Sequence, residues 1–209
     1  MLKHKQSTVQ GYFLCYYIPS RNDVTILSNL LISFKNNEPT DIIDEFCEWA
    51  STELSKEKIK VSIIVRALRS KETKVNTEIA LDILGHRLAT SLGASYKHDI
   101  LKKTRFTYPL KRLEFNERPT EINNTYYFDY DCSEEDSILI IDDIYTSGAT
   151  ISEIIRSIRV KAPDIPICFF TLGKTDFQFN MNKKILLPGY IYERNIDKLE
   201  EPVGEYVYL

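Results

Sequence analysis

Apolar and polar residues follow two different periods along this chain. Short apolar runs predict four buried strands, at Gly11–Ile18, Val61–Val65, Ile138–Ile141 and Pro166–Leu172, and Tyr126–Tyr130 alternates like a fifth. Apolar residues spaced three and four apart predict helices at Val24–Phe34, from Thr40, from Thr77 to Gly93, and at Thr150–Lys161. Strands that alternate with helices indicate an α/β fold with one open, mostly parallel sheet and helices on both faces.

The element boundaries are set by polar and helix-breaking residues. Thr40 is predicted to cap the second helix, and Pro163 ends the last one. Leu101–Pro119 is polar, basic and without clean periodicity, so we expect a long loop there. We expect one domain over residues 1–209, with residues 1–35 and 174–209 as a candidate small hood or elaboration.

Composition narrows the class of protein. Charged residues make up 27 % of the chain and the formal net charge is -3, which argues against a dedicated binder of duplex nucleic acid. Four scattered cysteines and three distant histidines do not have the spacing of a zinc site, so we expect no metal held by the protein alone. No apolar run is long enough to span a membrane, and we expect a cytoplasmic protein with reduced cysteines.

The segment 137–150 carries the clearest chemistry. Its apolar strand ends in two adjacent carboxylates, Asp142 and Asp143, and ligands of open α/β sheets bind beyond the carboxyl ends of the strands. Two such carboxylates accept hydrogen bonds from a vicinal diol, such as that of ribose, or attract a hydrated cation. The alternative is that the acids merely end a strand.

A small, hydroxyl-rich loop follows the acids without a spacer and leads directly into a helix. Backbone N–H groups at a helix start bind anions, and glycine allows close approach. The loop consists of Thr146, Ser147, Gly148, Ala149 and Thr150. A diol site beside a phosphate site describes ribose 5-phosphate, whereas the Gly-Lys-Ser/Thr of a Walker loop is missing.

This pattern resembles the phosphoribosyl pyrophosphate (PRPP) signature of type I phosphoribosyltransferases: four apolar residues, two acids, then a Thr/Ser-Gly-x-Thr loop. The resemblance implies that Asp142 and Asp143 hold the ribose hydroxyls and that Thr146–Thr150 binds the 5-phosphate. It also implies Mg²⁺, bound together with PRPP, and transfer of phosphoribosyl to a nitrogen nucleophile with release of pyrophosphate.

A looser resemblance to the ComF-like branch covers roughly residues 11–173. It rests on Asp143–Thr150, on Ile32–Lys35 and on the basic segments, while the zinc ribbon that this branch often carries is missing. Thr146 stands where 6-oxopurine enzymes have an aspartate, which argues against that acceptor. Lys174 follows the next strand, where those enzymes place a lysine on the purine; we interpret it instead as an exposed loop lysine.

Two basic segments are candidates for contact with the substrate. Arg69, Ser70 and Lys71 follow the second strand and are predicted to meet pyrophosphate, or else to form a solvated turn. Family members use a loop like Leu101–Pro119 as a lid, which suggests Arg105 as a catalytic residue beside the acid pair. A solvated charge cluster, or contact with a single strand of nucleic acid, is the alternative.

Several aspects of function stay open at this level. The N-terminal aromatics, Tyr12, Phe13, Tyr16 and Tyr17, would stack on an acceptor base or simply pack in the core. The expected partners are PRPP and an unidentified acceptor, with no membrane; a homodimer stays open. The alternative to an enzyme is a non-catalytic sensor of PRPP or nucleotides, or an accessory module in DNA uptake.

Overall fold

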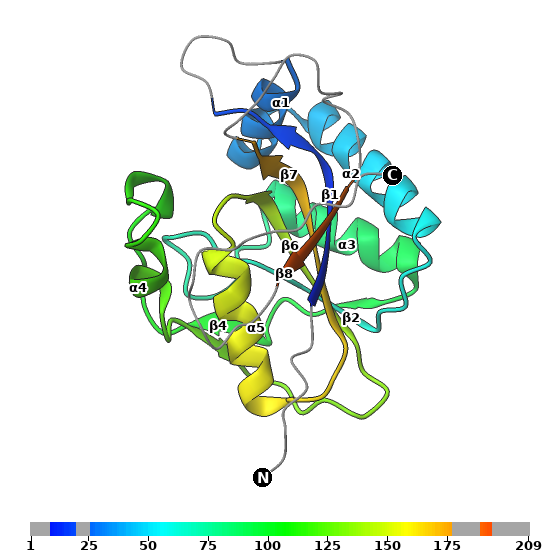
Figure 1. Cartoon of the computed structure of the whole chain (residues 1–209). Coiled ribbons are helices and arrows are strands. Elements are labelled where there is room, and N and C mark those ends of the chain that lie inside the picture. The colour runs from blue at the N-terminus through cyan, green and yellow to red at the C-terminus, as the bar shows by residue number, and fades with distance from the viewer. Residues whose placement is uncertain (1–8, 20–25, 177–188, 194–209) are drawn as a thin grey trace.

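The computed structural model describes residues 9–19, 26–176 and the backbone of 189–193. Their central feature is a six-stranded sheet (Figure 1). In spatial order, the strands are β3 (Ser95–Tyr96), β2 (Ile63–Arg66), β6 (Ile138–Tyr145), β7 (Ile167–Thr175), β1 (Val9–Tyr17) and β8 (Gly189–Glu193). The first five are parallel and β8 pairs antiparallel with β1. The predicted α/β fold with an open, mostly parallel sheet is therefore confirmed.

Helices cover both faces of this sheet, as predicted (Figure 1). One face carries α1 (Ile26–Asn36), α2 (Thr40–Lys56) and α3 (Ala80–Leu92). The other carries α5 (Ala149–Lys161) and a two-stranded antiparallel sheet of β4 (Leu101–Lys103) and β5 (Tyr126–Phe128). A short 3₁₀ turn, Leu110–Arg112, and α4 (Arg118–Ile122) connect β4 to β5.

The alternation of side chains along β6 explains why its apolar run is continuous. Ile138 and Ile140 pack towards α5, while Leu139 and Ile141 pack towards the three helices on the opposite face. All four side chains are fully buried. A strand buried on both faces needs apolar residues at every position, and each such side chain contributes roughly 1.5–3 kcal/mol through burial. This strand is the rigid base of the segment that follows it.

Several predicted boundaries shift. The strand after Ile138 continues through both acids to Tyr145, because β7 pairs with it along this whole length. Helix α3 starts at Ala80 rather than at Thr77, and Gly93, in the left-handed conformation, ends it as predicted. Pro39 occupies the N-cap of α2, so the prediction that Thr40 caps this helix was wrong.

The segment 101–119 is more ordered than the loop predicted there. Its first three residues form β4, which pairs with β5, and the buried Leu101 belongs to the core under α5. The alternation of apolar and polar residues expected of a strand covers too few residues here to be recognised in a basic segment. The part that lacks strand structure begins at Thr104.

The described part of residues 1–35 joins the main layers: β1 lies between β7 and β8, and α1 packs beside β1. Phe13 and Tyr16 are buried in the core, whereas Tyr12 and Tyr17 lie partly buried on the opposite face. Core packing therefore accounts for the burial of Phe13 and Tyr16. Most of the rest of the candidate hood, beyond residue 176, lies outside the described residues, and β8 supplies a strand at the sheet edge. None of the described helices has the length and apolar character needed to cross a membrane.

Candidate functional site

The acid pair lies at the carboxyl end of β6, near the middle of the sheet. Asp142 Oδ1 accepts the backbone N–H of Asp143 at 2.8 Å, and Asp143 Oδ1 accepts that of Ile144 at 2.7 Å. Both acids are partly exposed. Each carboxylate thus has one oxygen held by a backbone N–H, and its second oxygen, which in Asp143 contacts Lys35, is the one that other groups can reach.

The electrostatics of the pair are unfavourable to two full charges. Burial, reinforced by the negative charge of Asp143, raises the pKa of Asp142 well above its usual range, although Lys35 opposes this shift. Two adjacent carboxylates of this kind are stabilised by a cation or by hydrogen-bond donors from a ligand. The arrangement is therefore suited to binding, since a ligand relieves the repulsion.

The loop after β6 ends at a glycine, in a backbone conformation that residues with a side chain rarely adopt. Gly148 adopts φ 76°, in the left-handed region, and occupies the N-cap of α5. It offers no side chain to bond the first turn of the helix, so that turn's N–H groups face a position where an anion can accept from them. Thr146 is fixed by a 3.0 Å hydrogen bond between its hydroxyl and that of Thr175 in β7.

Lys35, in the last turn of α1, approaches the acid pair from a distant part of the sequence. Its Nζ lies 2.6 Å from Asp143 Oδ2. Burial alone would lower the pKa of Lys35, but the charge and hydrogen bond of Asp143, together with the charge of Asp142, outweigh it and leave the pKa raised. Sequence reasoning missed this contact: the Phe34-Lys35 helix end was noted only as a family likeness, and nothing in the spacing links it to Asp143.

The loop after β2 is shaped by a buried ion pair. The Arg66 side chain is fully buried, and its two terminal nitrogens bind the Glu72 carboxylate at 2.9 and 3.0 Å. Glu72 also accepts the backbone N–H groups of Arg69 and Asn76, at 2.6 and 3.1 Å. On the other side, Arg66 Nε lies 3.7 Å from the buried Asp82. This network holds the segment 66–76 in one conformation.

Within this loop, the three residues predicted to meet pyrophosphate occupy different settings. Arg69 donates to the backbone oxygen of Lys35 and, at 3.2 Å, to the side-chain oxygen of Asn37. Ser70 is partly buried, and Lys71 is exposed. The loop therefore lies next to the end of α1, and through Lys35 it is connected to the acid pair.

A buried lysine ties this loop to the second basic segment. Lys103 Nζ donates to the carbonyl oxygens of Arg69 and Ser70, at 3.1 and 3.4 Å, and to Thr107 Oγ1 at 2.9 Å. Burial lowers its pKa to about 8. The N–H of Thr107 donates to the Ser70 carbonyl at 2.9 Å, so the start of the predicted lid is fastened to the predicted pyrophosphate loop.

Arg105, predicted to be catalytic, is paired with Glu121. Its guanidinium binds the Glu121 carboxylate at 3.0 Å and also donates to the Glu121 carbonyl, while about half of its side chain is exposed. Contact between Arg105 and the acid pair is not among its described hydrogen bonds. Its catalytic role would require the segment to move, and it stays a prediction.

Lys174 corrects one sequence interpretation. It belongs to β7 and is 4 % exposed, so the view of it as an exposed loop lysine was wrong. Its Nζ lies 5.6 Å from the centre of the Phe13 ring, a cation–π contact. The strand continues past Leu172 because β1 and β6 pair with it on both sides.

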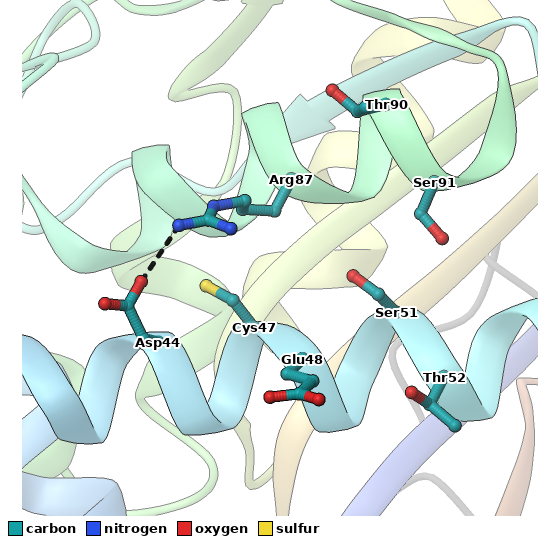
Figure 2. A pocket seen from close by; sticks show the side chains of 8 residues that line it. All are labelled: Asp44, Cys47, Glu48, Ser51, Thr52, Arg87, Thr90 and Ser91. Carbon is teal, nitrogen blue, oxygen red and sulfur yellow. Dashed lines mark hydrogen bonds and ion pairs between the residues drawn. The ribbon is translucent and has the colours of Figure 1, made fainter.

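A groove of about 580 Å³ lies elsewhere, between α2 and α3. Figure 2 shows Arg87 reaching across it to Asp44, at 3.0 Å, with Cys47 beneath. Hydroxyl groups of both helices line its other end. None of the residues predicted to bind PRPP lines this groove, so it is separate from the candidate site.

Comparisons with known proteins give fold likenesses at low identity. No family model and no curated protein matches the chain. A hypoxanthine phosphoribosyltransferase from Staphylococcus aureus aligns with a TM-score of 0.42 and 16 % identity, over 68 % of this chain and 69 % of that one.

Two further solved structures are similar to a comparable degree. The xanthine-guanine-hypoxanthine phosphoribosyltransferase of Helicobacter pylori has a TM-score of 0.41 and 13 % identity, over 66 % of this chain and 89 % of that one. The adenine phosphoribosyltransferase of Trypanosoma brucei has a TM-score of 0.42 and 11 % identity, over 82 % of both chains. Likenesses of this size leave the functional assignment to the chain's own residues.

Proposed function

We propose that this protein binds PRPP and transfers its phosphoribosyl group to a nitrogen nucleophile, releasing pyrophosphate. The observation that carries the proposal is the continuous passage from β6 through Asp142 and Asp143 to Gly148 and α5. Two carboxylates and the start of a helix lie within a few residues of each other at the carboxyl end of a central strand, which supports binding of a diol and of an anion there.

Each part of the site has a proposed task. The outer carboxylate oxygens of Asp142 and Asp143 accept the ribose hydroxyls, and the N–H groups of Thr146–Thr150 hold the 5-phosphate. Arg69, Ser70 and Lys71 face the pyrophosphate, held in place by the pairing of Arg66 with Glu72. Positive charge and N–H donors stabilise a leaving group that gains negative charge.

Carboxylate oxygens are the ligands that Mg²⁺ prefers, and Asp142 and Asp143 supply them. They would hold the ion only together with oxygens of the ligand, since Asp143 Oδ2 is already paired with Lys35. When bound, the ion would supply positive charge against the departing pyrophosphate.

The experiment is calorimetric titration of PRPP with Mg²⁺ into wild type and into the double variant Asp142→Asn/Asp143→Asn. We expect binding to the wild type and loss of binding in the variant. The matched control is Asp129→Asn/Asp131→Asn, which removes the same two charges from exposed acids. Absence of wild-type binding, or equal affinity of wild type and site variant, would refute the proposal.

Turnover is tested separately, by pyrophosphate release in a screen of bases and amines with PRPP and Mg²⁺. Release that depends on one acceptor class identifies the enzyme and its acceptor. PRPP binding without release over the whole screen would refute transfer and favour the sensor. In that case Asp142, Asp143 and the loop would still form a PRPP-binding site.

A further inference from the structure

Lys35 belongs to the same site as the acid pair, although it lies more than 100 residues earlier in the chain. Its ammonium group contacts Asp143 Oδ2 at 2.6 Å, and the Asp143 side chain is only 14 % exposed. The other oxygen of Asp143 accepts a backbone N–H. The ammonium group therefore occupies the position from which a cation would approach this carboxylate.

The backbone of Lys35 is anchored by other parts of the site. Its carbonyl oxygen accepts a hydrogen bond from Arg69. Two residues later, Asn37 adopts a left-handed φ of 65°, and its side-chain oxygen accepts from Arg69 at 3.2 Å and from the Ala80 N–H at 2.8 Å. The end of α1 is thus fixed between the loop after β2 and the start of α3.

The side chain of Lys35, in contrast, is long and partly exposed. It is 41 % exposed, and four rotatable bonds separate its ammonium from the anchored backbone. Lys35 thus contacts Asp143 through its ammonium group and Arg69 through its carbonyl oxygen, next to the loop where the proposed pyrophosphate would bind. A lysine ammonium group forms charge-assisted hydrogen bonds with carboxylates and with phosphates alike.

We propose that Lys35 is the resident counter-cation of the acid pair: it keeps a free divalent cation out of the ligand-free site, and it transfers its contact to the diphosphate when metal and PRPP enter together. Only the second part of this inference, the transfer of the contact to the diphosphate, rests on the proposed function. The first half concerns the ligand-free protein and needs no PRPP.

The first experiment titrates Mn²⁺, a paramagnetic substitute for Mg²⁺, into the ligand-free protein and measures free metal by electron paramagnetic resonance. We expect weak binding by wild type and about tenfold tighter binding by Lys35→Met, the factor that corresponds to removal of one charged competitor. Lys35→Arg should stay weak, because it keeps the charge. Lys102→Met, which removes the lysine at 3.1 Å from the exposed Asp129 instead, should match wild type.

The outcomes separate the two proposals. Unchanged Mn²⁺ affinity in Lys35→Met, or an equal gain in Lys102→Met, overturns the role of Lys35 whether or not PRPP binds. If Lys35→Met fails to fold, as judged by circular dichroism, Lys35→Gln is measured in its place with the same expectations.

The second experiment repeats the calorimetric titration of PRPP with Mg²⁺ on the same variants. Loss of the phosphate contact should weaken binding by Lys35→Met about tenfold, and Lys35→Arg should retain most of the affinity. Affinity equal to that of wild type, or higher, would overturn the transfer of the contact to the diphosphate. If wild type itself does not bind PRPP, the proposed function fails, while the Mn²⁺ result still decides whether Lys35 guards the acid pair.

Discussion

We expect the largest loss of folding stability from a substitution that neutralises one partner of the buried pair of Arg66 and Glu72. Glu72→Gln removes the negative charge that faces a fully buried guanidinium and alters the acceptors of two backbone N–H groups. Breaking a buried ion pair by neutralising one partner costs about 3–5 kcal/mol. Asp82 remains 3.7 Å from Arg66 Nε and two carbonyl oxygens still accept from its nitrogens, so we expect the lower end, about 3 kcal/mol.

Urea denaturation measures this cost. With a slope of about 2 kcal/mol per molar urea, a loss of about 3 kcal/mol lowers the midpoint by roughly 1.5 M. Glu53→Gln is the matched control, because Glu53 pairs with Lys56 at 2.7 Å on the surface of α2, where such a pair contributes less than about 1 kcal/mol. A loss below about 1 kcal/mol for Glu72→Gln would refute the assignment of a buried, uncompensated charge.

The dependence on pH gives this prediction a second, independent readout. Burial would raise the pKa of Glu72, but the hydrogen bonds from Arg66 and from the backbone outweigh it and leave the pKa lowered. The contribution of this carboxylate to stability is then fully present above its unfolded pKa of about 4.3, and it is lost as the pH falls through the lower folded pKa. The difference between wild type and Glu72→Gln should shrink in acid, and a difference that is constant down to the folded pKa would contradict the pairing.

Three further predictions follow from the same structure. Gly148→Ala and Gly93→Ala should each lower the stability by about 1–2 kcal/mol, because both glycines have positive φ. Only Gly148→Ala should also weaken PRPP binding in calorimetry. If both variants bind PRPP with equal affinity, the loop at Gly148 does not hold the phosphate. Relative to Lys103→Met, wild type should gain stability as the pH rises from 8 to about 10.5, by at most about 1.4 kcal/mol per pH unit. The reason is that the lowered pKa of Lys103 in the folded protein leaves the unfolded chain with more bound protons in this range. Parallel stability profiles of wild type and variant would refute this. Hydrogen exchange should show residues 104–119 slowed by PRPP, with β4 protected throughout; a segment already protected in the free protein is no lid.

The sequence alone determined the architecture because its hydrophobic periods are strong. A strand such as Ile138–Ile141, which is apolar at every position, is stable only when it is covered on both faces. Helix α5, with apolar residues at 151, 154, 155 and 158, has one apolar side and packs against a single layer. The acid pair and the loop to Thr150 were visible for a related reason. They are contiguous, so their chemistry is encoded by local order.

Tertiary structure decided everything that depends on distant segments meeting. Lys35 reaches Asp143, Lys103 fastens the Arg69 loop, and Arg66 is buried against Asp82; each contact joins residues whose separation leaves no period to detect. A charged residue in a sequence is normally solvated, because burial of a charge is costly unless a partner meets it. Only the packing of α1, α3, β4 and the loop after β2 around the end of β6 supplies those partners, and so only the folded chain could reveal them.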